Sequence, residues 1–348
     1  MVFTNNDAVK LFSLAFGIGT KNKKGSWLEV YYPIPYFNPS SADVKKISEV
    51  LGYESGNCNI ELSNDLISQL APVVNDSRQQ EILGMMRNST KPKVACFIES
   101  DVDLSSTPEA YLKLHLLSHR YVKPNHINLT GIFSQLPNVA WTSEGAIDPR
   151  EVTDQQLKAR AEGRVLEVSS IDKFPKMSNY VIPSGVRISH TARVRLGAYL
   201  GEGTTVMHEG FVNFNAGAIG PNMIEGRLSQ GVTMGEGSDL GGGASTMGTL
   251  SGGGDIILSI GKDCLIGANA GTGIPLGDRC IIEAGLYITA STIVQVMDEN
   301  RSFVKVAKAR ELAGQNDMLF IRNSQTGVVE CRSNQKAIQL NETLHDHN

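Results

Sequence analysis

Aliphatic residues recur at every sixth position in the second half of the chain. Seven consecutive positions keep this spacing, with one small residue among them: Ile188, Val194, Leu200, Val206, Val212, Ala218 and Ile224. A repeat of six residues predicts a coil with three flat faces, in which each face is one short strand and each corner is a tight turn. The aliphatic side chains then stack inside the coil, which we expect over residues 184–295.

The spacing shifts after Glu225 and returns at Met234. We expect extra residues at each such shift, and we interpret residues 248–258 (GTLSGGGDIIL) as a loop that leaves the coil. Coils of about eighteen residues would give roughly six turns over this domain. Glycine often follows the aliphatic position directly, where we expect corner φ values that are costly for other residues. These glycines are Gly201, Gly235, Gly241, Gly261, Gly267 and Gly277.

The rest of the chain shows no repeat. Residues 26–34 and 93–100 are apolar runs typical of strands, and a helix is predicted from Thr107, with Thr107 as its cap and Pro108 at its first position. A short helix is expected near residues 150–162. After Val294 the pattern predicts a strand, a short helical stretch and a hairpin. We therefore expect a mixed α/β domain, a connecting segment, the coil and a small α/β extension, at residues 1–130, 131–183, 184–295 and 296–348.

Charge and cysteine content narrow the classes of partner and compartment. The 32 basic and 36 acidic residues are well mixed and give a formal charge of -4, so the chain has no field that would gather nucleic acid or a membrane surface. The five cysteines are odd in number and form no C-x-x-C pair, which argues against a disulfide framework and a thiolate zinc site. With no leader pattern at the N-terminus, these features favour the cytoplasm.

Several motifs resemble one enzyme family. They are DKFPKM (172–177), RVRLGAYLGEGTTVMHEGFVNFNAG (193–217), MIEGR (223–227), GSDLGGGASTMGTLSGGG (237–254), LIGANAG (265–271), EAGLYITA (283–290) and RNS (322–324). In this order they are similar to the tetrahydrodipicolinate N-succinyltransferases of the longer bacterial type. The resemblance implies a left-handed parallel β-helix, although parallel crossovers are otherwise right-handed. It also implies a homotrimer with active sites between subunits.

The resemblance implies that succinyl-CoA and tetrahydrodipicolinate are the substrates, with no tightly bound cofactor. Glu225 matches the catalytic glutamate, which acts either as a base towards the amine or as a nucleophile that forms an acyl anhydride. Arg227 matches a succinyl-CoA contact, and its planar fork suits a carboxylate or phosphate, although a structural ion pair is an alternative. Further matches to CoA-binding positions are Gly242, Ser245, Ala268, Glu283, Ala284, Ser291, Lys308, Arg322, Asn323 and Ser324.

Some positions depart from the family pattern or offer other chemistry. Ser291 stands where the family often has glycine, and Ile321 stands where it often has arginine. Glu209 matches a position that binds Mg²⁺ near the trimer axis, but Ala192 replaces its usual aspartate partner. His208 is an alternative catalytic base, because other hexapeptide acyltransferases use histidine.

A metal site and two other functions are also considered for this sequence. His115 and His119 lie four apart on the predicted helix, but no acidic or cysteine partner is spaced to complete a metal site, so we assign them to packing or to the surface. The coil could serve an acyltransferase that uses another donor, such as acetyl-CoA. It could also serve a trimeric scaffold without catalysis, although Glu225 and its motif argue against this.

Overall fold

The computed structural model describes residues 10–251 and 255–333. The chain forms two compact units, one of Met1–Leu116 with Ile127–Pro175 and one of Leu117–His126 with Lys176–Asn348. The four-part division made from the sequence stays a prediction. Among the residues described, no helix has the length and apolar character needed to cross a membrane.

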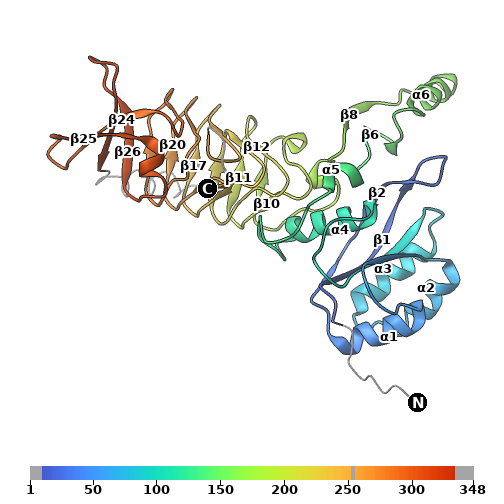
Figure 1. The fold of residues 1–348 in the computed structure, drawn as a ribbon. Coiled ribbons are helices and arrows are strands. Elements are labelled where there is room, and N and C mark those ends of the chain that lie inside the picture. The colour runs from blue at the N-terminus through green and yellow to red at the C-terminus, as the bar shows by residue number, and fades with distance from the viewer. Residues whose placement is uncertain (1–9, 252–254, 334–348) are drawn as a thin grey trace. The chain divides into compact units, whose positions relative to one another are not determined.

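The first unit contains an antiparallel sheet of five strands. Its order is β2-β1-β5-β4, with β3 paired to β1. The strands are β1 (Ser13–Lys21), β2 (Trp27–Tyr31), β3 (Tyr36–Phe37), β4 (Cys58–Glu61) and β5 (Lys93–Ile98). The helices α1 (Ser41–Leu51), α2 (Asn64–Leu70) and α3 (Ser77–Arg87) share one apolar core with β1 and β5 (Figure 1). Both strands predicted from apolar runs are confirmed as β2 and β5.

The predicted helix from Thr107 is confirmed as α4 (Thr107–Ser118), but its cap was wrong. Ser106 caps the helix, because its Oγ accepts a hydrogen bond from the Glu109 N–H. The Thr107 hydroxyl instead donates to the carbonyl of Gln135 at 2.7 Å. Inside the helix, His115 bonds through Nδ1 to the Tyr111 carbonyl and accepts from the Tyr32 N–H at Nε2. This arrangement uses both ring nitrogens in packing.

A smaller sheet completes the first unit. It has the order β7-β6-β8 and consists of β6 (Val139–Thr142), β7 (Gly145–Ile147) and β8 (Val168–Asp172). The single turn α5 (Ile132–Gln135) precedes it, and α6 (Val152–Ala161) lies between β7 and β8 in the chain. The short helix expected near residues 150–162 is thereby confirmed.

The second unit is built on three sheets, and the strands of the coil pair in parallel. One sheet has the order β10-β13-β16-β19, a second has β12-β15-β18-β21-β23, and a third runs β9-β11-β14-β17-β20-β22 before it meets the C-terminal strands (Figure 1). The strands are β9 (Arg187–Ile188), β10 (Tyr199–Leu200), β11 (Thr204–Val206), β12 (Phe211–Val212), β13 (Gly217–Ala218), β14 (Asn222–Ile224), β15 (Arg227–Leu228), β16 (Thr233–Met234), β17 (Asp239–Leu240), β18 (Ser245–Thr246), β19 (Ser259–Ile260), β20 (Leu265–Ile266), β21 (Gly271–Thr272), β22 (Ile281–Ile282) and β23 (Tyr287–Ile288).

The strand register shows that the six-residue spacing shifts after Glu225 for a different reason from the one expected. Val206 pairs with Ile224, a coil of 18 residues, but Ile224 pairs with Leu240 and closes a coil of 16. The coil after Glu225 is therefore two residues shorter, not longer. Its corner contains only Glu225 and Gly226 before strand β15 begins. Leu228, which the spacing of six did not select, fills the buried position of that strand.

The explanation given for the corner glycines was also wrong. Gly201, Gly235 and Gly267 do not have positive φ values. A Cβ on Gly267 would lie 2.5 Å from the Ala284 N, so these glycines are required where one coil approaches the next. Left-handed residues lie instead three positions after a buried stacked residue, as at Gly243 and Asn269.

The predicted loop and C-terminal extension are both found. Thr249 pairs with Ile257 in an isolated antiparallel bridge, so the chain leaves the coil and returns, while residues 252–254 lie outside the described range. The extension places η3 (Ala309–Leu312) after β25 (Phe303–Lys308) and closes with a hairpin, with residues 334–348 outside the described range. Its other strands are β24 (Ile293–Met297), β26 (Met318–Arg322) and β27 (Val329–Ser333).

Candidate active site

Most predicted site residues lie along one corner of the coil. We call edge A the line formed by the corners that follow β11, β14, β17, β20 and β22, together with the end of β26 and the turn after it, at residues 207–210, 225–226, 241–244, 267–270, 283–286 and 321–324. Backbone hydrogen bonds join successive corners, for example from the Glu225 N–H to the Leu240 carbonyl at 2.8 Å. Residues far apart in the sequence are thus brought into one row by the register of the coil.

Glu225 is half-buried on edge A. Its carboxylate Oε2 lies 3.4 Å from the position that a Cβ on Gly242 would occupy. Within the described residues, neither carboxylate oxygen has a hydrogen bond or an ion pair. A carboxylate beside a bare glycine backbone leaves room for a bound group to reach it, which is the arrangement that a base or a nucleophile requires.

The next residues carry the chain onto the five-stranded sheet β12-β15-β18-β21-β23, which we call the flank sheet. Arg227 and Ser245 lie side by side on adjacent strands of the flank sheet, and Ser245 is followed by Gly271. Arg227 is exposed, and among the described residues its guanidinium has no partner. The predicted alternative, a structural ion pair, therefore finds no support within one chain.

Further along edge A, the predicted residues have small side chains or side chains that bond to the backbone. Ala268 and Ala284 are exposed, and the Gly285 N–H donates to the Ala268 carbonyl at 2.8 Å. Glu283 is half-buried, and its Oε2 accepts from the Arg322 N–H at 2.8 Å. This bond ties the β26–β27 hairpin to the corner that follows β22.

The remaining predicted residues belong to the extension or lie close to it. Asn323 holds the β26–β27 turn, because its side-chain oxygen accepts from the backbone N–H groups of Gln325 and Thr326. Ser324 is exposed in the same turn, and Lys308 is exposed at the end of β25. Ser291 lies in the corner after β23, on a different line from edge A, with its hydroxyl 3.4 Å from that of Thr289.

The residues near Glu209 do not make a Mg²⁺ site within one chain. One Glu209 oxygen accepts from Arg193 at 2.8 Å and the other from His208 Nδ1 at 2.8 Å. The hydrogen bond from His208, together with the charge of Arg193, lowers the pKa of the Glu209 carboxyl. The described residues contain no group of three or more metal-ligating side chains. Magnesium prefers several oxygen ligands, so a carboxylate held by a guanidinium is a poor ligand set.

Comparison with known proteins decides the family. Two family models match, "Tetrahydrodipicolinate N-succinyltransferase middle" over residues 136–176 and "Hexapeptide repeat of succinyl-transferase" over residues 257–290. A curated 2,3,4,5-tetrahydropyridine-2,6-dicarboxylate N-succinyltransferase from Pseudomonas paraeruginosa is 62% identical over 340 residues, which cover 97% of this chain and 99% of that protein. The chain belongs to the tetrahydrodipicolinate N-succinyltransferase family.

Other relatives agree with this assignment. A family member from Vibrio cholerae of the same name is 50% identical, over 97% of this chain and 99% of its own length. The crystal structure of a Campylobacter jejuni protein, described as a 2,3,4,5-tetrahydropyridine-2-carboxylate N-succinyltransferase, superposes with a TM-score of 0.88 at 30% identity. The matched region covers 96% of this chain and 95% of the Campylobacter jejuni chain. The succinyltransferase fold is thus confirmed as an α/β region, a left-handed parallel β-helix and a C-terminal extension, and the chain is an acyltransferase.

Sequence reasoning missed two contacts made by outward-facing residues on or beside the flank sheet. The ring of Tyr287 covers Gly271, where a Cβ would lie 2.2 Å from the ring, and Tyr287 remains 39% exposed. Arg195 lies 5.8 Å from the centre of the Phe211 ring and bonds to Asn213. The signal that could have found them is the alternation of inward and outward residues in each short strand. The hexad search followed the inward positions only.

Proposed function

We propose that the chain carries out the reaction of its family at edge A. The succinyl group of succinyl-CoA passes to the amine of tetrahydrodipicolinate in its open form, 2-amino-6-oxopimelate, a step of the diaminopimelate route to lysine. The observation that carries this placement is the unpaired Glu225 carboxylate beside Gly242. It stands at one end of a row of small or backbone-presenting residues.

In this proposal the CoA arm follows edge A. From the corner of Glu225 to that of Arg322 there are four steps between coils, or about 19 Å at the usual spacing of paired strands. The small side chains of Gly242, Ala268 and Ala284 leave room for an extended pantetheine arm to lie close to the backbone. Lys308 and the turn of Arg322, Asn323 and Ser324 supply cationic and polar groups for the nucleotide end.

The chemistry requires a neutral amine at the thioester carbonyl. The amine nitrogen forms a bond to the carbonyl carbon, the carbon–sulfur bond breaks, and the CoA thiolate leaves. Glu225 acts there either by accepting the proton of the amine or by first taking the succinyl group as an anhydride. Arg227, beside it, contacts a carboxylate or phosphate of succinyl-CoA.

The decisive test is the Glu225→Gln variant. Turnover of succinyl-CoA with 2-aminopimelate should fall by roughly 10³-fold or more, because the amide can neither accept a proton nor carry an acyl group. CoA binding and assembly should not change, since the volume is conserved. Free-thiol release gives the rate, and mass spectrometry of rapidly quenched wild-type enzyme detects a succinyl adduct on Glu225 if the anhydride forms. Near-normal turnover in the variant would move the catalytic role to His208.

We also propose a cytoplasmic homotrimer whose protomers share each site. The exposed Arg227 and the half-buried Glu225 lie on a flank and a corner that a second copy would enclose, and the five cysteines are free thiols. No step is assigned to Mg²⁺, because the groups around Glu209 within one chain do not suit it.

A further inference from the structure

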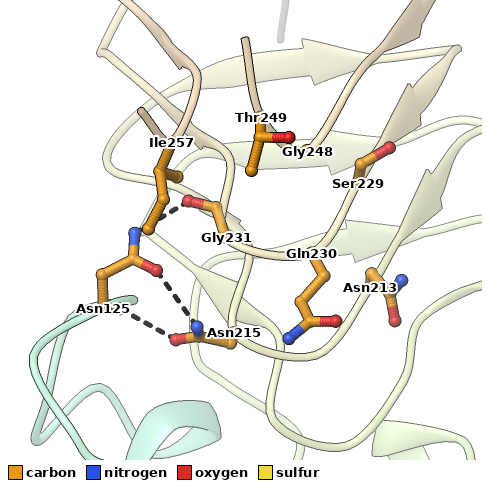
Figure 2. A pocket seen from close by; sticks show the side chains of 9 residues that line it. All are labelled: Asn125, Asn213, Asn215, Ser229, Gln230, Gly231, Gly248, Thr249 and Ile257. Atoms are coloured by element: carbon orange, nitrogen blue, oxygen red, sulfur yellow. Dashed lines mark hydrogen bonds between the residues drawn. The ribbon is translucent and has the colours of Figure 1, made fainter. Parts of the chain in front are cut away.

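A pocket lies beside the segments that follow β12, β15 and β18, at the end of the flank sheet away from edge A. Its volume is about 510 Å³, and we call it the amide pocket. Six polar side chains and one aliphatic side chain line it together with two glycines, and none of the side chains is charged (Figure 2). They are Asn125, Asn213, Asn215, Ser229, Gln230, Gly231, Gly248, Thr249 and Ile257.

Two of the asparagines build the wall and have their groups occupied. The Asn125 N–H donates to Asn215 Oδ1 at 2.8 Å, Asn215 Nδ2 donates to Asn125 Oδ1 at 3.1 Å, and Asn125 Nδ2 donates to the Gly231 carbonyl at 2.8 Å (Figure 2). This network joins the segment Leu117–His126 to the corners of the coil. These bonds hold one wall of the pocket in place. We therefore expect other residues to contact a bound ligand.

Asn213 is oriented so that it offers donors. Its Oδ1 accepts from Arg195 Nη1 at 3.0 Å and from the Phe214 N–H at 3.0 Å. Since both of these neighbours are donors, the carbonyl side of the amide must face them, and the NH₂ group is turned away from them. Within the described residues, no acceptor takes up that NH₂ group or the exposed amide of Gln230.

Such a pocket suits a carboxylate. N–H groups are the donors that carboxylate oxygens accept, and a nearby guanidinium adds a favourable positive charge. Arg195 supplies this charge through Asn213. The hydroxyl of Thr249 adds a further donor on the loop side, while Ile257 gives the pocket one apolar wall.

The location of the pocket indicates which carboxylate it takes. Ser229 of the pocket lies two residues beyond Arg227 and four beyond Glu225. At about 3.3 Å per residue, the Cα atoms of Glu225 and Ser229 are at most roughly 13 Å apart. A seven-carbon chain, together with the side chains that would reach its two ends, can cover a separation of this order. The proposed CoA path runs from Glu225 along the stack of coils towards the β26–β27 hairpin, whereas β15 leads across one coil to the pocket, so the two do not compete.

We propose that the amide pocket binds the distal carboxylate of the amino acceptor, with Asn213 and Gln230 as donors. This inference rests on the proposed function, which places the reacting amine at Glu225. It makes the enzyme selective for amines that carry a second carboxylate at the far end of the chain. The pocket would thereby set the acceptor class, while edge A binds the donor.

The test compares two acceptors that differ only at the distal end. 2-Aminopimelate ends in a carboxylate, and 2-aminoheptanoate ends in a methyl group. The variant Asn213→Asp keeps the oxygen that Arg195 and Phe214 require but replaces the NH₂ donor with a negative oxygen. Asn300→Asp is the matched control, because it makes the same change at an exposed position in the β24–β25 turn.

We expect kcat/KM for 2-aminopimelate to fall roughly 10- to 100-fold in Asn213→Asp, the usual effect of losing a charged hydrogen bond. The value for 2-aminoheptanoate and the KM for succinyl-CoA should change by less than about twofold. Calorimetric binding of both amines to the enzyme with CoA gives the same comparison where turnover of 2-aminoheptanoate is slow. Gln230→Ala should show the same selectivity with a smaller loss.

The outcomes separate the inference from the proposed function. Equal losses for both amines would overturn the inference, because they indicate a structural role, and so would an unchanged preference for 2-aminopimelate. Loss of activity in Glu225→Gln together with no selective effect in Asn213→Asp would retain the proposed function and reject the pocket. A wild-type enzyme that releases no thiol with 2-aminopimelate would overturn both.

Discussion

At the scale of the residue, Glu225 occupies a position that holds glycine in the next two coils along edge A. Gly241 and Gly267 stand at the same place in later coils, where a Cβ would approach the backbone of the neighbouring coil within 3 Å. The shortened corner moves this close approach to Gly226, whose Cβ would lie 2.3 Å from the Ala244 carbonyl oxygen. A side chain at residue 225 is therefore tolerated, and it lies over Gly242.

The contact between Glu225 and Gly242 predicts a dependence on size at residue 242. An alanine Cβ at 3.4 Å from the carboxylate makes an ordinary contact, so Gly242→Ala should keep most of its activity. Gly242→Val adds two methyl groups that displace either the carboxylate or the CoA arm, and a displacement of about 1 Å costs up to 10²-fold in kcat/KM. Steady-state thiol release measures both variants. Full activity in Gly242→Val would contradict a CoA path along edge A.

At the scale of the element, the β26–β27 hairpin depends on one buried carboxylate. Glu330 accepts a hydrogen bond from Asn323 at 2.7 Å and one from Arg332 at 2.8 Å. These bonds, that from Asn323 first, lower the pKa of the Glu330 carboxyl below its usual 4.5. Because the folded-state pKa is depressed, the carboxylate stabilises the hairpin above about pH 4.5, and this stabilisation is lost as the pH falls through the folded-state pKa.

Glu330→Gln should therefore destabilise the enzyme in a pH-dependent way. At pH 7 we expect the free energy of unfolding to fall by about 1–3 kcal/mol, the usual range for a hydrogen-bonded charge. The difference from wild type should shrink as the pH is lowered through the acidic range, where the wild-type carboxyl becomes protonated. Thermal midpoints measured against pH give the comparison, with the exposed Glu299→Gln as control. A constant difference across pH would exclude this cause.

The sequence predicted the coil well because the buried stack repeats, but it did not predict the details that depend on corner length. Leu228 was missed because it follows Ile224 by four residues, and Thr246 was missed because its stacked position holds a polar residue. Glu225 and Arg227 were predicted as site residues from a motif, and this stays a prediction. The row that Glu225 forms with Gly242 and Ala268 could be derived only from the strand register, which depends on two 16-residue coils that no regular spacing reveals. Asn125 reaches the amide pocket from a distant segment, so no local pattern marks it.

At the scale of the whole molecule, the proposed site is open on one side within a single chain. Light scattering at working concentration should give three times the chain mass of 37.6 kDa. The physical reason is that the flank sheet leaves Arg227 and Tyr287 exposed, and we expect these side chains to gain contacts when another copy covers the sheet. A monomer mass in a fully active preparation would contradict the shared site.

The stacked coils fix the spacing between groups along edge A. Because neighbouring coils are joined strand to strand at about 4.8 Å, the separation between two groups on this edge can change only by whole coils. An insertion at a corner enlarges that corner, as in the loop after β18, and does not change the spacing between coils. Leu240 still pairs with Ile266 across this loop. An acyl carrier with a shorter or longer arm could be accommodated only by removing or adding a complete turn of about 16 to 18 residues, in one step.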